Sequence, residues 1–302
     1  MNQPYASRRD VSARIARLFV YPVKSCAGVE VQEFLLTATG PEYDRAWMVV
    51  DAQGTFVSQR EHPRMALVQP KLMPDELILS TPGMPDLHIA LDLKEHPASV
   101  TVWDDRVGAF DMGDEAAQWF TDFLSTPDNS STGSVRRSYR LVRFDPASPR
   151  DSDPKWTDGV RALNQFNDGF PLLLLGEASH AQLNERLLAA GHNSVVIERF
   201  RPNVVLSGLD PHDEDLLDVM HVDANGEEVL LKPVKPCPRC PIPNVDPQTG
   251  RSSPEVGDML QSYRRDARLD GAVTFGMNAI ILRGIGTPLR VGQSVSADFV
   301  FE

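Results

Sequence analysis

Short apolar runs separated by turn residues dominate roughly the first hundred positions. The strand-like runs are residues 14–21, 29–36, 44–50, 56–58, 66–69, 76–80, 87–91 and 99–102. Short strands at this spacing are typical of a small sheet or barrel. The pattern changes at residues 114–124, where Ala117, Phe120 and Leu124 fall on one helical face behind an acidic first turn. This periodicity predicts a helix that ends the first structural unit.

The second half of the chain is also rich in strand patterns. A polar stretch, residues 125–135, is the best linker candidate, and residues 145–159 form a second irregular segment. The predicted strands are residues 170–175, 203–207, 221–223, 228–232, 272–282, 288–291 and 294–301. Two helices are expected, at residues 177–190 and 254–264, and no repeat of solenoid period is present. We therefore predict an α+β, β-rich protein with a small N-terminal β-barrel-like domain and a larger β-barrel.

Composition narrows the class of protein. The 302 residues are 41% apolar and 24% charged, which is ordinary for a globular protein of one or two domains. No apolar run approaches the ~18 residues of a membrane span, and the first ten residues lack the apolar segment of a secretory signal. Three cysteines are not a disulfide framework, so a cytoplasmic location is expected. The net charge of −12 argues against nonspecific nucleic-acid binding.

Two of the three cysteines lie in one proline-rich segment, Cys237-Pro-Arg-Cys240-Pro-Ile-Pro-Asn-Val-Asp246-Pro-Gln-Thr-Gly250. Six prolines from Pro233 to Pro247 each fix φ and remove a backbone donor. We therefore expect a rigid extended loop, neither a helix nor a central strand. Arg239 precedes Cys240, and a cation beside a thiol favours the thiolate, which is both nucleophile and metal ligand.

Other interpretations of the two thiols are weaker. Cys237 and Cys240 have half the spacing of a zinc site, but Cys26 is alone and no histidine pair has ligand spacing. The prolines oppose the helix that a thioredoxin-type motif needs. We treat all seven histidines as satisfied or solvated residues, and Asp246 as a turn residue. Simple packing cysteines remain the plain alternative, although they need neither the adjacent arginine nor a stiff backbone.

Cationic and polar residues recur at strand ends, mostly beside glycine or proline. They are Lys24 and Ser25 in a tight turn, Arg45 just before Trp47, Arg201 and Asn203 in an Arg-Pro-Asn segment, and Arg239. Each cation alone is most simply a solvated surface charge. If these side chains converge in the fold, they would form a phosphate-binding site. A phosphate site beside a thiolate suggests a phosphorylated cofactor whose metal is bound by Cys240.

Four motifs in order carry a family resemblance. They are Val20-Tyr21-Pro22-Val23-Lys24-Ser25-Cys26-x-Gly28, then Asp44-Arg45-x-Trp47, then Phe200-Arg201-Pro202-Asn203-x-Val205-x-Ser207-Gly208, and the Cys237 to Gly250 segment. Together they resemble the MOSC family, the molybdenum cofactor sulfurase C-terminal superfamily, and within it the branch of amidoxime-reducing components. The resemblance implies a MOSC N-terminal β-barrel domain over residues 11–125 and a MOSC catalytic domain over residues 136–302.

The resemblance also implies a site. It assigns Cys240 as the ligand of molybdenum in a molybdopterin cofactor and leaves Cys237 a structural or supporting residue. The implied cofactor-binding residues are Lys24, Ser25, Arg45, Arg201, Asn203 and Arg239. Asn167, Asp168 and Gly169 occupy a segment where relatives favour Ser and Thr, so that assignment is less specific. Asn278 is placed only by its position in the strand-like run of residues 272–282.

The function implied is reduction of small N-hydroxylated compounds (hydroxylamines, amidoximes and N-hydroxylated bases) to amines. No cysteine follows Cys240, so we expect no iron–sulfur cluster in this chain. Electrons would come from a separate donor protein of ferredoxin, flavodoxin or cytochrome type, with no nucleic-acid or membrane partner. One alternative is a sulfur carrier that holds a persulfide on Cys240. A non-catalytic binding module or structural zinc protein is the third interpretation.

Overall fold

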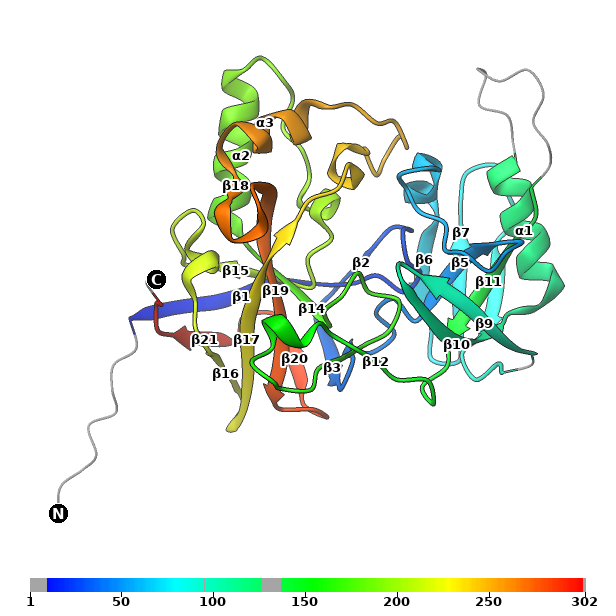
Figure 1. The fold of residues 1–302 in the computed structure, drawn as a ribbon, viewed down its shortest axis with the longest axis horizontal. Helices are drawn as coiled ribbons and strands as arrows, with labels where there is room; N and C mark the ends of the chain where they lie inside the picture. The colour runs from blue at the N-terminus through cyan, green and yellow to red at the C-terminus, as the bar shows by residue number, and fades with distance from the viewer. Residues whose placement is uncertain (1–9, 95, 126–136, 301–302) are drawn as a thin grey trace.

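The computed structural model describes residues 10–94, 96–125 and 137–300 (Figure 1). Most of the predicted linker therefore lies outside the described residues. The three described α-helices are α1 (Gly113–Ser125), α2 (Glu177–Ala189) and α3 (Glu255–Tyr263). Strands make up most of the remaining regular structure, so the predicted α+β, β-rich class is confirmed. No helix among the described residues is long and apolar enough to cross a membrane.

A closed barrel of seven strands forms the larger body of the described chain. In order around the barrel they are β14 (Leu172–Gly176), β15 (Val204–Ser207), β1 (Val11–Val20), β21 (Ser294–Ala297), β16 (Met220–Ala224), β17 (Glu227–Pro238) and β19 (Ala272–Arg283), which pairs back to β14. Alternation of buried and exposed residues in β1 sends Val11, Ala13 and Ile15 into the barrel core. The closure leaves the apolar interior fully enclosed by paired backbone.

Helices α2 and α3 cover one side of the barrel, at the top in Figure 1. Their apolar faces carry Leu183, Leu187, Val256 and Leu260, which pack with Phe275 of β19 in one buried cluster. This packing supports the part of β19 that faces the proline-rich cysteine segment.

The smaller body surrounds a second core. One sheet contains β5 (Trp47–Asp51), β11 (Tyr139–Phe144), β10 (Asp105–Asp111) and β9 (His96–Val102), and another contains β6 (Gln69–Leu72), β7 (Glu76–Ser80) and β8 (Leu87–Ala90). Helix α1 seals this core with Trp119, Phe120 and Phe123, as its periodicity predicted. Short strands elsewhere are β2 (Val29–Val31), β3 (Glu33–Thr37), β4 (Gly40–Pro41), β12 (Arg150–Asp151), β13 (Leu163–Asn164), β18 (Arg265–Asp266) and β20 (Pro288–Arg290).

Two strands do not pair within the expected division of the sequence. Strand β1 pairs with β15 and β21 of the large barrel, although it begins the N-terminal region. Strand β11 pairs with β5 and β10 of the smaller sheet, although it follows the predicted linker. The domain boundaries at residues 11–125 and 136–302 stay a prediction. The N-terminal strand β1 belongs to the barrel, and β11, after the predicted linker, still belongs to the smaller body.

Two predicted strands in the smaller body are wrong. Residues 56–58 make one isolated bridge, between Phe56 and Val50, because the Ser58 carbonyl accepts from the amides of Glu61 and His62 and turns the chain. Most of residues 66–69 belongs to a 3-10 helix, η1 (Pro63–Leu67), and to the turn after it. This helix begins at a proline whose fixed φ suits the first helical position.

We expected that residues 233–247 avoid a central strand, and for residues 233–238 this is also wrong. Strand β17 runs to Pro238, between β16 and β19. Its register with β19 shifts between Pro233 and Lys235 and again between Pro236 and Pro238. Prolines lack the N–H that a regular ladder needs, and these irregularities accommodate them. Cys237 is therefore a strand residue, and Cys240 follows just past the strand end.

Gly276 provides the matching irregularity in β19. Pro236 pairs with Met277 and Pro238 with Thr274, so two residues of β19 oppose Cys237. Gly276 has φ of +75°, and a Cβ built there would lie 2.6 Å from the carbonyl oxygen of Leu174. Both the backbone angle and the close approach of β14 require glycine.

We predict that Gly276→Ala lowers the free energy of unfolding by roughly 2–3 kcal/mol, since it adds a clash to the backbone strain. Gly271→Ala is the control, because Gly271 has a similar φ of +78° and a methyl group added there would meet no atom within 4 Å. It should cost about 1 kcal/mol. Chemical denaturation of both variants measures the difference, and equal losses would contradict this account of β19.

Candidate functional site

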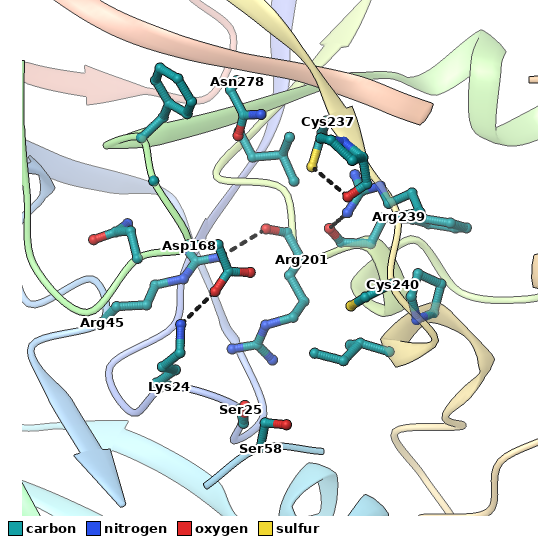
Figure 2. A pocket seen from close by; sticks show the side chains of 18 of the residues that line it. Lys24, Ser25, Arg45, Ser58, Asp168, Arg201, Cys237, Arg239, Cys240 and Asn278 are labelled. Atoms are coloured by element: carbon teal, nitrogen blue, oxygen red, sulfur yellow. Dashed lines mark hydrogen bonds and ion pairs between the residues drawn. The ribbon is translucent and has the colours of Figure 1, made fainter. Parts of the chain in front are cut away.

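All the residues singled out from the sequence as site residues line one pocket between the barrel and the smaller body. They are Lys24, Ser25, Arg45, Asn167, Asp168, Gly169, Arg201, Asn203, Arg239, Cys240 and Asn278. The pocket encloses about 830 Å³ of empty space, including its solvent-open mouth. Figure 2 shows Lys24, Arg45 and Asp168 on one side, the two cysteines and Arg239 on the other, and Arg201 between them.

The turn after β1 places Lys24 in the pocket wall. Lys24 is buried, and its Nζ donates to the Phe166 carbonyl at 2.7 Å and to Oδ1 of Asp168 at 2.5 Å. Burial lowers the pKa of Lys24, and the neighbouring carboxylate only partly opposes this. Asp168 itself is exposed, and the Lys24 ammonium beside it holds the Asp168 pKa well below its usual range.

A buried carboxylate, Asp44, organises the pocket floor. It is 0% exposed and accepts from the amide of Tyr21 at 2.9 Å and from Nη1 of Arg45 at 2.6 and 2.7 Å. It also accepts from Nδ2 of Asn203 at 3.0 Å and Nδ2 of Asn167 at 3.2 Å. One side chain thus joins three of the residues predicted to bind a cofactor. In the sequence, Asp44 stood out only as part of a motif.

Arg201 brings a buried cation to the centre of the pocket. It adopts a left-handed φ of +57°, and its Nη1 donates to the Cys26 carbonyl at 2.5 Å while its guanidinium lies 4.3 Å from the Tyr21 ring centroid. Burial, with help from nearby Arg45, lowers the Arg201 pKa to about 10. Among the described residues its Nη2 and the Tyr21 hydroxyl have no hydrogen-bond partner. A buried cation in this state calls for an anionic ligand.

Arg239 lines the pocket, and backbone carbonyls hold its guanidinium. Its Nε donates to the Phe275 carbonyl at 2.8 Å and its Nη1 to the Phe200 carbonyl at 3.0 Å. The guanidinium thereby ties β19 to the Arg201 segment instead of pairing with sulfur. Burial raises the pKa of the Cys237 thiol, and the charge of Arg239 offsets this only in part. At neutral pH Cys237 is a thiol.

The two cysteines lie on the same wall of the pocket (Figure 2). Both are free, and the Cys237 thiol points toward the Pro238 carbonyl, 3.8 Å away. Within the described ranges, no three His, Cys, Asp or Glu side chains converge as ligands of a metal ion. A metal here would need most of its ligands from elsewhere, as it does when a cofactor carries it.

The side chains of Asn203, Asn167 and Asp246 make hydrogen bonds that serve the fold itself. Asn203 is buried and used by the fold, because its Oδ1 accepts from the Leu173 amide at 3.1 Å. Oδ1 of Asn167 accepts from the Gln165 amide at 3.1 Å, which shapes the loop that presents Asp168. Asp246 accepts from the amide of Gln248 at 2.8 Å, so the predicted turn role is confirmed.

Sequence reasoning missed the contribution of the smaller body. Phe56, Ser58, Arg60 and Trp103 line the same pocket. The Ser58 hydroxyl donates to Oε2 of Glu61 at 2.5 Å and accepts from Nε of Arg60 at 3.1 Å. The one available signal was a tryptophan at a position between two strand-like runs, residue 103. Pairing of distant segments, which the pattern does not encode, brings these residues to the thiols.

The chemistry of this donor set suits a phosphorylated, metal-carrying group. Lys24 and Arg45 have carboxylate partners, whereas Arg201 and Arg239 bind only carbonyls among the described residues. The pocket therefore has cationic capacity for an anion, next to two soft ligands, the sulfurs of Cys237 and Cys240.

Known proteins match this chain along most of its length. Residues 12–127 match the MOSC N-terminal beta barrel domain and residues 163–296 the MOSC domain. The chain is 35% identical over 300 residues to mitochondrial amidoxime reducing component 2 of Rattus norvegicus, covering 93% of this chain and 82% of that protein. It is 34% identical to mitochondrial amidoxime-reducing component 1 of Homo sapiens, with the same coverage. Molybdenum cofactor sulfurase of Bos taurus is 28% identical, covering 84% of this chain and 29% of that protein.

We predict that Asp44→Asn lowers the free energy of unfolding by about 3 kcal/mol, because it leaves the partly buried Arg45 without its carboxylate and sets an amide against several donors. Asp151→Asn is the control, since Asp151 pairs with Arg161 at the exposed surface and should leave the melting temperature unchanged. Thermal unfolding compares the two, and matching melting temperatures would remove Asp44 from its central role.

Proposed function

The chain belongs to the MOSC family, and from that premise we propose that it is a molybdenum-cofactor-dependent oxidoreductase that reduces N-hydroxylated compounds to amines. The reaction consumes two electrons and two protons and releases water with the amine. Hydroxylamines, amidoximes and N-hydroxylated bases are the proposed substrates. The names of the amidoxime-reducing relatives support this reaction class.

One observation carries the proposal. The buried guanidinium of Arg201 has an unpartnered nitrogen, among the described residues, in the same pocket as the sulfur of Cys240. Arg201 lines the pocket, and a guanidinium without a carboxylate partner suits the phosphate of a small cofactor. A zinc site or a packing role for the cysteines leaves this nitrogen unexplained.

The protein's own residues would bind and orient the cofactor. Lys24, Arg45 and Arg201 would neutralise its phosphate, and Cys240 would be the one protein ligand of its metal. Arg239 would add positive charge, and it also fixes the backbone carbonyls of Phe200 and Phe275. When bound, the cofactor supplies the oxygen-atom chemistry.

Electrons would come from a separate donor protein of ferredoxin, flavodoxin or cytochrome type. The net charge of −12 favours a donor that presents a complementary basic patch. Association would then weaken as ionic strength rises, because surface charges are screened.

A sulfur carrier is the second candidate, favoured by the similarity to molybdenum cofactor sulfurase. In that case Cys240 would hold a persulfide, and the cationic pocket would bind an anionic sulfur acceptor. A cyanide-labile sulfur on the purified protein, without molybdenum, would support this candidate over the reductase.

We predict that Cys240→Ser loses molybdenum by at least about tenfold, because it removes the thiolate ligand. Cys237→Ser is the matched control and should retain most of the metal, since that thiol stays protonated. Mass spectrometry for molybdenum and fluorescence of the oxidised pterin measure both variants, expressed in a host that makes the cofactor. Full and equal molybdenum in the two variants would contradict the assignment of Cys240.

A further inference from the structure

Trp103 occupies a turn position that disfavours its side chain. Strands β9 and β10 form a hairpin in which Val102 pairs with Asp105, so Trp103 and Asp104 make a two-residue turn. Trp103 has a left-handed φ of +55°. Glycine is the usual residue at such a position, and a bulky side chain there is strained. Strain of this kind clusters at ligand-binding sites, where contacts made by the side chain compensate for it.

The indole is also more exposed than the other two tryptophans of the smaller body. Trp103 is 39% exposed, whereas Trp47 and Trp119 are 0% and 6% exposed in the core of the smaller body. It lines the same pocket as Cys240, although the two residues come from different bodies of the fold. A large aromatic surface left uncovered inside a pocket is a typical ligand contact.

Neighbouring groups hold the indole in place before any ligand arrives. The Phe56 ring lies 5.0 Å away between centroids, and the Arg60 guanidinium is 4.5 Å from the indole centroid. Nε1 of Trp103 donates to Oδ1 of Asp168 at 3.2 Å. The ring therefore loses little freedom when a ligand stacks on it, which favours affinity.

We propose that Trp103 determines substrate specificity by giving the carbon skeleton of the substrate a flat aromatic contact at the pocket. This inference rests on the proposed reductase function and adds the residue and the preference. Lys24 and Arg45 lie on one side of the pocket and Arg239 lies with the thiols on the other (Figure 2), and these groups suit polar and anionic parts of a ligand. Trp103 and Phe56 instead favour a substrate whose N-hydroxylated group is attached to a planar ring over one attached to a short alkyl chain.

A purely structural role predicts different behaviour. Trp103 could matter only because its N–H orients Asp168, the partner of Lys24. Trp103→Phe separates the two roles, because it keeps a ring and removes the N–H. Trp103→Gly removes both and suits the positive φ, so it is expected to fold.

The test compares benzamidoxime with acetamidoxime as substrates of the cofactor-loaded protein, with a reduced viologen dye as electron donor. Trp103→Gly should lower the ratio of the two kcat/KM values by about tenfold, and Trp103→Phe by less than about threefold. Leu188→Ala, at an exposed apolar position on α2 outside the pocket, should leave the ratio unchanged. Equal losses in the Gly and Phe variants would overturn the proposal in favour of the Asp168 contact, and an unchanged ratio in the Gly variant would overturn it outright.

Binding of the products gives a readout that does not need turnover. Calorimetry should show benzamidine bound more tightly than acetamidine by the wild-type protein, and this preference should be lost in Trp103→Gly. If the wild-type protein reduces neither amidoxime, the proposed function fails, and the binding preference alone then decides whether Trp103 is an aromatic contact. No preference in the wild-type protein would overturn the inference even with reductase activity intact.

Discussion

The buried carboxylate of Asp44 is the constraint on which the rest of the site depends. An ionised carboxylate away from water is costly unless donors surround it, and here Arg45, Asn203, Asn167 and the Tyr21 amide do so. These donors come from separate segments of the chain, so satisfying one charge fixes the relative positions of all of them. The loop that presents Asp168 and the segment that presents Arg201 follow from this arrangement. Loss of the hydrogen bonds to Asp44 would displace pocket residues even if those residues themselves were unchanged.

The charges of the pocket are unequally matched. Lys24 and Arg45 form ion pairs with carboxylates. Among the described residues, Arg201 and Arg239 donate hydrogen bonds only to carbonyls. Carbonyl dipoles orient a guanidinium without neutralising it. A protein with a net charge of −12 thus keeps uncompensated positive charge at one buried place. Nη2 of Arg201 has no hydrogen-bond partner in the described part of the chain, so this charge is left for an anionic ligand.

Prediction from the sequence succeeded where the signal was local and failed where it depended on distant pairing. Helix α1 and strand β7 (Glu76–Ser80) follow from periodicity, and Lys24, Arg201 and Cys240 stood out by residue type and position at strand ends. The prolines of β17 led to the wrong prediction of a loop, because the bulge at Gly276 that accommodates them lies on another strand. Arg239 is a second case in which distant segments supply the partners. Its neighbour in sequence is a thiol, but the carbonyls that it binds come from Phe200 and Phe275, far away along the chain.

The two bodies of the fold are halves of one site. Strand β1 starts in the barrel, its following turn supplies Lys24, and the chain then enters the smaller body at β5 (Trp47–Asp51), just after Asp44 and Arg45. Strand β11 completes the sheet of the smaller body before the chain returns to the barrel through the loop that carries Asp168. The cations are therefore positioned by both bodies, and the thiols by the barrel alone. The smaller body adds the hairpin that carries Trp103, whose indole N–H donates to Asp168 on the returning loop.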